Sequence, residues 1–250
     1  MTPILYPAID LLGGRAVRLR HGDRRSAKVY SEDPPAQARA FVEQGAQALH
    51  VVDLDAAFGE ARQTAVLAGI VRAAMPVPVQ LGGGIRAIEQ IEATLEAGAA
   101  RAILGTAAVE RPELAGEAVR RFGPERIACG IDVKDGRAAT RGWTEARGPS
   151  PERLAALFAR MGVAWLVVTA VARDGTMEGF DLRLLRDVAL SAPSANVIAS
   201  GGAGSLSHLK ALAAAGVPGL AGAIAGTALY EGQFSIRDAQ AALDRVGERA

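Results

Sequence analysis

The chain has 250 residues, half of them hydrophobic and 22% charged, a composition that excludes an intrinsically disordered protein and suits one domain with a large core. The formal net charge of +1 provides no global field for a polyanion, so neither nucleic acid nor a membrane surface is expected as a partner. One cysteine excludes an internal disulfide, and the N-terminal residues show no signal peptide or membrane-spanning run, which predicts a cytoplasmic protein.

Short apolar or β-branched runs alternate along the chain with segments of helical periodicity. In chain order, the predicted strands are Ile4–Ile9, Ala48–Asp53, Val77–Leu81, Ala102–Leu104, Arg126–Asp132, Trp165–Thr169, Asn196–Ser200 and Leu220–Ala225. The predicted helices include Pro35–Gln44, Ile88–Ala97, Glu113–Phe122, Glu152–Met161 and Leu206–Ala215. Continuously apolar strands that alternate with helices predict a parallel sheet covered by helices. Eight such units in this length predict an α/β protein, a single (β/α)8 TIM barrel over residues 1–250.

The second half of the sequence repeats motifs of the first half in the same order, at an offset of roughly 120 residues. The matched motifs are Ala8–Asp10 with Gly130–Asp132, Val51–Asp53 with Val167–Thr169, Gly83–Gly84 with Gly201–Gly202, and Gly105–Thr106 with Gly226–Thr227. Chance is a poor explanation for four matches in order. The repeat predicts that the barrel is built from two similar half-barrels, about 1–123 and 124–250.

Asp10 and Asp132 each end a predicted strand, and the repeat makes them equivalent. The carboxyl ends of barrel strands form the active face, so these two carboxyl groups are expected on opposite sides of the barrel mouth. Two carboxyl groups in different environments can act as general acid and general base. The alternative is that each aspartate only caps the loop that follows it. A symmetric pair at a barrel mouth favours catalysis.

Glycine-rich turns follow four of the predicted strands. Glycine lets backbone N–H groups approach an anion closely, and a helix N-terminus adds a favourable dipole. The residues expected to hold phosphate are Gly83, Gly84, Gly105 and Thr106 in a first cradle, and Gly201, Gly202, Gly226 and Thr227 in a second cradle. Tight turns without a ligand are the alternative. Two matched pairs, each with a Gly-Thr, predict a small-molecule substrate with two phosphates and two equivalent cradles.

Two long segments, 11–34 and 133–150, follow the strands that end in the two aspartates, and both are predicted to be loops that act as lids. The first segment is rich in basic residues and includes Arg18. The second carries Arg141 and Trp143. Because Trp143 stands among polar residues and glycines, a core position is hard to build for it. Its ring is therefore expected to stack on a flat heterocycle.

These motifs together resemble the isomerases of histidine biosynthesis, which convert a phosphoribosylformimino-aminoimidazole carboxamide ribotide from its aminoaldose to its aminoketose form. The resemblance covers nearly the whole chain and rests on residues 7–11, 17–19, 50–55, 80–86, 104–108, 139–143, 173–176, 199–202 and 228–232. It implies an aldose–ketose isomerase that performs an Amadori rearrangement without a metal or an organic cofactor. A monomer is expected.

The resemblance also implies roles for individual residues. Asp132, as acid, would open the ribose ring, and Asp10, as base, would remove the proton from C2′. Thr169 would be a third catalytic residue, and Asp174 would position the substrate with it. The other substrate-binding residues would be Arg18, Arg86, Arg141 and Trp143, of which Trp143 would stack on the aminoimidazole.

Three alternatives stay open. A bifunctional isomerase would also accept phosphoribosylanthranilate, since the same acid–base pair would serve both reactions. The sister cyclase of the pathway would show Cys-Leu-Asp at the first strand and a lysine after the following valines, where this chain has Ala8-Ile9-Asp10 and Val17-Arg18. A barrel that only binds a phosphorylated ligand would not need both aspartates. Ala170 replaces an acidic residue common in the family, and only a change in packing is expected from it.

Overall fold

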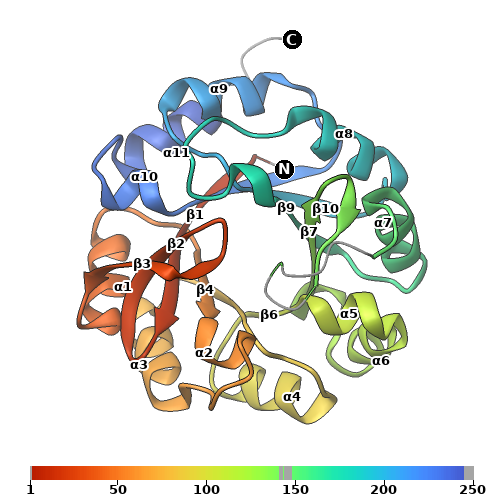
Figure 1. Ribbon diagram of the computed structural model, residues 1–250, viewed down its shortest axis with the longest axis horizontal. Coiled ribbons are helices and arrows are strands. Elements are labelled where there is room, and N and C mark those ends of the chain that lie inside the picture. Colours follow the sequence, from red (N-terminus) through yellow and green to blue (C-terminus); the bar gives the residue numbers. More distant parts are fainter. Residues whose placement is uncertain (1, 141–142, 144–147, 245–250) are drawn as a thin grey trace.

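The computed structural model describes residues 2–140, 143 and 148–244, and its centre is a closed barrel of parallel strands, seen end-on in Figure 1. The barrel strands are β1 (Ile4–Leu12), β4 (Leu49–Asp53), β5 (Val79–Gly82), β6 (Arg101–Leu104), β7 (Ile127–Lys134), β9 (Trp165–Ala170), β10 (Asn196–Ser200) and β11 (Leu220–Ala225). β11 returns to β1 and closes the ring, with Ile4 opposite Gly222. The (β/α)8 barrel predicted from the sequence is confirmed.

Most of the helices form a ring around the barrel (Figure 1). In chain order the helices are α1 (Pro34–Glu43), α2 (Leu54–Ala57), α3 (Thr64–Ala74), α4 (Ile88–Glu96), α5 (Thr106–Glu110), α6 (Pro112–Phe122), α7 (Pro151–Arg160), α8 (Leu182–Ser191), α9 (Leu206–Ala214), α10 (Thr227–Tyr230) and α11 (Ile236–Asp244), with 3-10 turns η1 (Pro124–Arg126) and η2 (Val171–Arg173). Local sequence fixes several starts: the Asp181 carboxylate, for example, accepts from the Leu184 N–H in the first turn of α8. Within the described part of the chain, no helix combines the length and the apolar character needed to cross a membrane.

The hydrophobic core has two layers. The larger layer lies between the strands and the surrounding helices, where Leu49, Ile91 and Phe158 are fully buried. The smaller layer fills the barrel interior and consists of Tyr6, Ala8, Ala48, Ile103, Ala128, Trp165, Val167, Ile198, Ala221 and Ile224. Because side chains fill the interior, a ligand can bind only at the mouth of the barrel.

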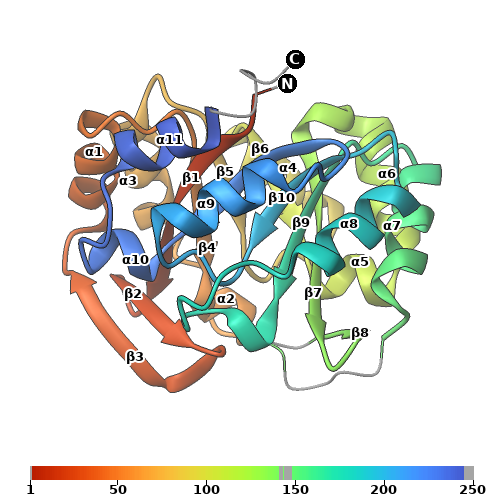
Figure 2. The ribbon, with the colours of Figure 1, turned by 90° about the horizontal axis from the view of Figure 1, so that it is seen from above.

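Residues 11–34, predicted to be a loop, instead form a β-hairpin. β2 (Arg15–Arg20) and β3 (Asp23–Ser31) are antiparallel strands that lie on the mouth side of the barrel (Figure 2). β2 pairs with the end of β1, where Asp10 stands opposite Val17. The loop prediction was wrong because it was based on the basic residues of this segment and overlooked Ala16, Val17 and Leu19, the three side chains of β2 that are buried.

The second segment predicted to be a loop, 133–150, begins with strand residues. The end of β7 pairs with the two-residue strand β8 (Arg137–Ala138) in antiparallel fashion. Beyond β8, the backbone of Trp143 has a left-handed conformation, with φ 68°. Arg141, predicted to bind substrate, lies outside the described residues.

Candidate active site

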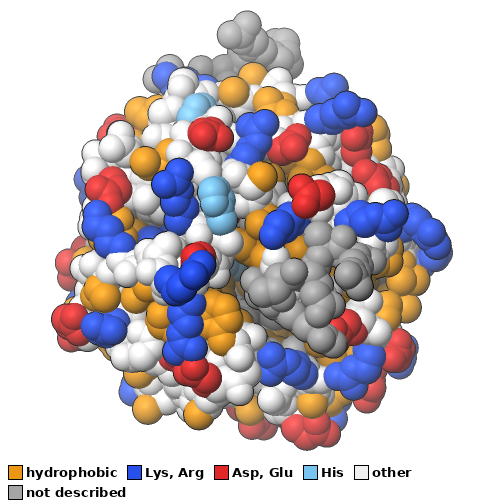
Figure 3. Space-filling view, viewed as in Figure 1, with side chains coloured by type: hydrophobic (Ala, Val, Ile, Leu, Met, Phe, Trp, Pro, Cys, Tyr) orange, Lys and Arg blue, Asp and Glu red, His pale blue; other side chains and the backbone are white. Residues whose placement is uncertain are grey.

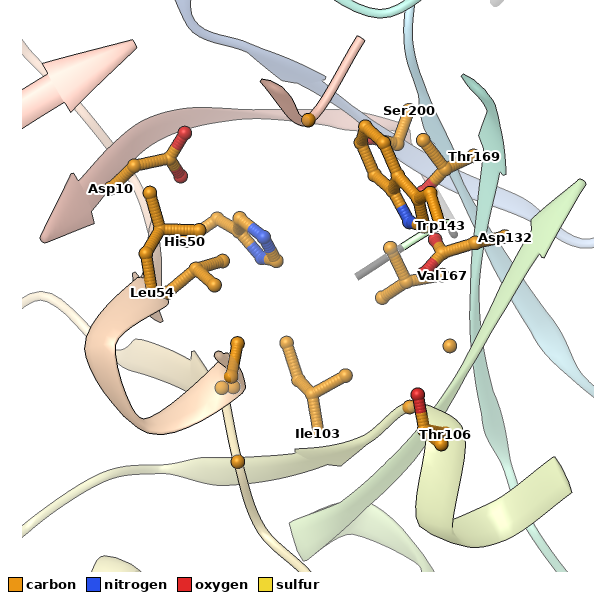
Figure 4. Close-up of a pocket in the computed structure, with 18 of the residues that line it drawn as sticks. Asp10, His50, Leu54, Ile103, Thr106, Asp132, Trp143, Val167, Thr169 and Ser200 are labelled. Atoms are coloured by element: carbon orange, nitrogen blue, oxygen red, sulfur yellow. The ribbon is translucent and has the colours of Figure 1, made fainter. Parts of the chain in front are cut away.

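The strand ends predicted to form the active face surround a cavity of about 220 Å³ at the barrel mouth (Figure 4). The predicted site residues that line it are Asp10, Arg18, Gly83, Gly84, Arg86, Gly105, Thr106, Asp132, Trp143, Thr169 and Asp174. A second cavity, of about 20 Å³, is lined by the second cradle: Gly201, Gly202, Gly226 and Thr227. Arg18 and Asp174 line both cavities. The structure thus brings together every predicted site residue that it describes.

Asp10 stands at the mouth end of β1 and forms an ion pair with Arg18 of β2. Arg18 Nη1 donates to Asp10 Oδ2 at 2.7 Å, and Arg18 Nη2 lies 3.9 Å from Asp174 Oδ1. The pKa of Asp10 is raised to about 6, and burial of the carboxyl group is the largest cause. The positive charge of Arg18 lowers this pKa, and the negative charge of Asp174 raises it. A carboxyl group with this pKa is mostly ionised at neutral pH yet can accept a proton during turnover, as acid–base chemistry requires.

Asp132 stands at the mouth end of β7, across the cavity from Asp10 (Figure 4). Burial raises its pKa most strongly, while hydrogen bonds from the Trp143 and Thr169 side chains lower it and the charge of Asp174 raises it. Thr169 is its direct neighbour on β9, because Asp132 and Thr169 are in register. The two aspartates therefore have different partners: a cation at Asp10 and uncharged donors at Asp132.

Trp143 connects the two halves of the mouth. A Cβ added at Gly22, in the turn of the β2–β3 hairpin, would lie 2.7 Å from the Trp143 ring, so the indole packs against this glycine. The ring also lines the cavity. Stacking of Trp143 on a heterocycle stays a prediction. Its side chain contacts Asp132 and the hairpin, and its backbone carbonyl accepts from Lys134 Nζ at 3.3 Å.

Asp53 and Thr169, which match in the sequence repeat, differ in the structure. The Asp53 carboxylate is fully buried and accepts from the backbone N–H groups of Ala56 at 3.1 Å and Gln63 at 2.9 Å. It therefore caps α2 and the loop beyond it. Thr169 instead donates to Asp132 in the cavity. Asp53 therefore has the loop-capping role that the sequence offered as the alternative for Asp10 and Asp132.

One glycine of each cradle, Gly83 and Gly202, occupies a position that no larger residue can share with the neighbouring backbone. Gly83 has φ 99°, and a Cβ there would lie 2.2 Å from the carbonyl oxygen of Asp53. In the second cradle, Gly202 has φ 103°, and a Cβ there would lie 2.1 Å from the carbonyl oxygen of Gly179. Both cradles are thus pressed against the loop of the preceding strand, which fixes the position of their backbone groups.

We expect Gly83→Ala to destabilise the protein far more than Gly59→Ala. The two glycines have similar positive φ values, 99° and 92°, but nothing lies within 4 Å of a Cβ at Gly59. Gly59→Ala should lower the free energy of unfolding by roughly 1–2 kcal/mol from backbone strain, and Gly83→Ala by roughly 3–5 kcal/mol because of the added collision. Urea unfolding measures both. Equal midpoints for the two variants would contradict the close contact at Gly83.

The two cradles differ in what surrounds them, although the sequence repeat predicts equivalence. A Cβ at Gly226 would lie 2.4 Å from Arg18 Cζ, whereas a Cβ at Gly105 would meet nothing within 4 Å. The guanidinium of Arg18 is therefore part of the second cradle. Among the described residues, Arg18 Nε is buried and has no hydrogen-bond partner. It is a free donor at the place predicted to hold a phosphate.

The rim of the mouth carries basic side chains. Figure 3 shows Lys and Arg side chains gathered over the β2–β3 hairpin beside the centre of this face, and the exposed basic residues of that hairpin are Arg15, Arg20, Arg24, Arg25 and Lys28. Within the described part of the chain, all of these except Arg20 form ion pairs with acidic residues, which reduces the net positive charge of the rim. Arg86 is also exposed, and its Nη2 donates to the Ala57 carbonyl at 3.3 Å. A basic rim attracts an anionic ligand.

Sequence reasoning missed two polar side chains of the cavity, His50 and Ser200. His50 lies within the strand predicted over residues 48–53, where it is the one polar residue before Asp53 ends the strand. That alone could have marked it as facing the barrel mouth. Its tautomer and its partners, however, depend on neighbouring strands that the sequence does not align.

A (β/α)8 barrel with two glycine cradles, a rim of basic side chains and two partly buried carboxyl groups at its mouth defines an acid–base enzyme for a small phosphorylated substrate. The chain belongs to the histidine biosynthesis protein family, whose model matches residues 4–235.

Similar proteins extend over nearly the whole chain. A protein of Methylobacterium nodulans is 47% identical over 98% of this chain and 96% of its own length. A protein of Paracoccus denitrificans is 49% identical over 96% of this chain and 99% of its own length, and one of Moorella thermoacetica is 46% identical over 95% and 97%. All three are named 1-(5-phosphoribosyl)-5-((5-phosphoribosylamino)methylideneamino) imidazole-4-carboxamide isomerase.

Proposed function

We propose that this enzyme converts N′-(5′-phosphoribosyl)formimino-5-aminoimidazole-4-carboxamide ribonucleotide, an aminoaldose, into its aminoketose, a step of histidine biosynthesis. One observation carries the proposal: Asp10 and Asp132 stand near the mouth ends of their strands, on opposite sides of a single cavity (Figure 4). The first cradle lines this cavity, and Arg18 and Asp174 line both it and the cavity of the second cradle. The substrate supplies a phosphate for each cradle. The names of the three relatives support the same reaction, and none of them mentions phosphoribosylanthranilate.

Asp132 is the general acid in this mechanism. Its carboxyl group donates a proton to the ribose ring oxygen, the bond from C1′ to that oxygen breaks, and the substrate nitrogen completes a Schiff base. Asp132 is left as a buried carboxylate. Hydrogen bonds from Trp143 and Thr169 stabilise that carboxylate, and they lower its pKa against the effect of burial. These donors carry no charge, so they stabilise the carboxylate that forms on proton release without the stronger lowering of the Asp132 pKa that a cation would cause.

Asp10 is the general base. The positive charge of Arg18, 2.7 Å from Asp10 Oδ2, favours the ionised carboxylate that can remove the proton from C2′ of the Schiff base. The resulting enolamine then becomes the ketone. The different partners of the two aspartates support this division of roles, with the cation beside the base.

The cradles and the rim bind the two ends of the substrate. Glycine backbone N–H groups hold one phosphate at Gly84 and the other at Gly202, where Arg18 Nε adds a free donor. Arg86 contributes charge at the rim, and Trp143 covers the aminoimidazole from the side of Asp132. The proton transfers at Asp10 and Asp132 require neither a metal nor an organic cofactor.

The acid limb of kcat/KM is expected near pH 6. Asp10 must be ionised to act as base, and burial raises its pKa to about 6. Activity should therefore be lost as the pH falls through this value, about tenfold for each further pH unit. The profile is measured between about pH 5 and 8, with circular dichroism at each pH to verify folding. An acid limb at the pKa of an ordinary aspartate would contradict the assigned environment of Asp10.

A coupled assay with the aminoaldose tests the function itself. The same purified enzyme is run in parallel with phosphoribosylanthranilate at matched concentrations. Turnover of the first substrate alone is the expected result. Turnover of both would establish the bifunctional alternative, and turnover of neither would reject the proposed function.

The cellular setting and the assembly belong to the same proposal. A biosynthetic reaction on a small phosphorylated metabolite supports a cytoplasmic location and a monomer that binds neither nucleic acid nor membrane. The division into half-barrels, about 1–123 and 124–250, is also proposed. The matched positive φ values at Gly83 and Gly201, 99° and 83°, support it.

A further inference from the structure

His50 is a partly buried titratable group in the cavity that the proposed mechanism does not use. It belongs to β4, and its ring points into the cavity from the side of Asp10, opposite Trp143 and Val167 (Figure 4). Asp10 on β1 is in register with Val52, so His50 lies two residues deeper along the neighbouring strand. A substrate whose C2′ meets Asp10 must therefore pass close to this ring.

Three side chains in one row on neighbouring strands determine which nitrogen of the His50 ring carries the proton. His50, Gln80 and Arg101 are in register on β4, β5 and β6. Arg101 Nη1 lies 3.2 Å from Gln80 Oε1, and Gln80 Nε2 lies 3.0 Å from His50 Nδ1. A guanidinium can only donate, so the oxygen of the Gln80 amide must face Arg101 and its N–H must face His50. His50 Nδ1 is then an acceptor, and the ring proton is on Nε2.

Arg101 is itself held firmly. Its guanidinium lies over the Trp165 ring, 3.6 Å from Cζ to the centroid, and its Nε donates to the Glu125 carbonyl at 3.1 Å. Trp165 Nε1 donates to the carboxylate of the same Glu125 at 2.8 Å. Gln80 is only 2% exposed, so water does not compete for its amide. The orientation of the row is therefore set by packed groups at the floor of the barrel.

The ring stays uncharged at any working pH. Burial and the positive charge of Arg18 lower the pKa of His50 to about 3. The charged groups that face it are Arg18 from β2 and Asp10 from β1, with Arg101 beyond Gln80. A neutral imidazole can donate one hydrogen bond without giving up its proton, as an electrophile does in some other isomerases.

We propose that His50 donates its Nε2–H to the substrate oxygen on C2′, and that Gln80 and Arg101 are positioning residues that hold the tautomer required for this. The inference rests on the proposed function. Asp10 removes the proton from C2′, so the oxygen on the same carbon lies beside it. That oxygen is a hydroxyl in the substrate and in the enolamine; it loses its proton as C1′ gains one, and it becomes the carbonyl of the product. A fixed N–H donor stabilises the negative charge that develops on the oxygen as its proton leaves.

Two replacements of His50 separate hydrogen bonding from packing. His50→Gln keeps an uncharged N–H donor, whereas His50→Met fills similar space without one. We expect His50→Met to lower kcat about 100-fold with a smaller change in KM, and His50→Gln to retain at least about a tenth of the activity. Equal activity of the two variants, or undiminished turnover by His50→Met, would overturn the proposal.

The tautomer is read directly by ¹⁵N NMR of the histidine rings in the substrate-free enzyme. In the unmodified protein the proton is expected on Nε2 of His50. In Gln80→Glu the carboxylate can only accept, so the proton should move to Nδ1, or the ring should acquire a second proton and titrate in the measurable range. Gln233→Glu, the same change on the exposed surface, should leave the His50 signals unaltered.

The NMR experiment tests the role of His50, and the activity assay tests the proposed function, so either proposal can be rejected without the other. A proton on Nδ1 of His50 in an active isomerase would reject this inference and leave the proposed function intact. An enzyme inactive toward the aminoaldose would reject the proposed function, while the tautomer and its dependence on Gln80 would still be measured without substrate.

Discussion

Asp10→Asn is expected to lower kcat by roughly 10²–10⁴-fold, because an amide cannot accept the proton from C2′. The replacement preserves the size of the side chain and its oxygen, which still accepts from Arg18 in place of Asp10 Oδ2. Folding and substrate binding should therefore persist. The acid limb of the pH profile should disappear with the carboxyl group that produces it.

Asp132→Asn is expected to produce a loss of the same order by removing the acid instead of the base. Trp143 and Thr169 can still donate to the amide oxygen, so the local structure should change little. Kinetics with the aminoaldose, together with substrate affinity from titration calorimetry, measure both variants. Because two consecutive proton transfers are blocked separately, each single variant should be nearly as slow as the double variant.

Asp181→Asn is the matched control for both replacements. Asp181 caps α8 through the Leu184 N–H, and asparagine is an equally good capping residue. It lines neither cavity. This variant should keep full activity. Turnover by Asp10→Asn or Asp132→Asn at the rate of the control would remove the acid–base pair from the mechanism.

The barrel could be predicted from the sequence because its signals are local. Each barrel strand is a short apolar run, and residues at or just beyond its mouth end carry the chemistry, as with Asp10, Asp132 and the cradle glycines. Once eight strands close in parallel, their ends must meet at one mouth. The site therefore followed from the fold with no knowledge of individual contacts.

The remaining features depend on which strands become neighbours. The β2–β3 hairpin was missed because its arginines resemble a solvated loop, and its pairing with β1 is what brings Arg18 to Asp10. His50 could not be assigned a role for a similar reason. Its tautomer depends on Gln80 and Arg101, and only the register of three strands places these residues in one row.

The placement of Arg18 also makes the two halves of the mouth unequal. Position 105 and position 226 are matched glycines before matched threonines, and their backbones are alike, with φ −93° and −118°. Arg18 fills the space beside Gly226 alone. One residue of the proposed first half-barrel thus lies in the cradle of the proposed second half, where it connects the proposed phosphate site to Asp10, the proposed base.

Gly226→Ala is consequently expected to impair the enzyme much more than Gly105→Ala. A methyl group at Gly226 would lie 2.4 Å from Arg18 Cζ, and the flexible guanidinium would yield before the backbone does. Substrate would lose a phosphate donor, so KM should rise about 10- to 100-fold, in line with the loss of one or two hydrogen bonds to a charged group. Gly105→Ala meets open space and should change KM by only a few fold.

The pH profile distinguishes displacement of Arg18 from a general disturbance of the second cradle. The charge of Arg18 lowers the pKa of Asp10, so moving the guanidinium away should raise that pKa and shift the acid limb of kcat/KM above pH 6. Gly105→Ala leaves Arg18 in place and should keep the limb where it is. If both variants raised KM equally and neither moved the limb, Arg18 could not be the connection between the second cradle and the base.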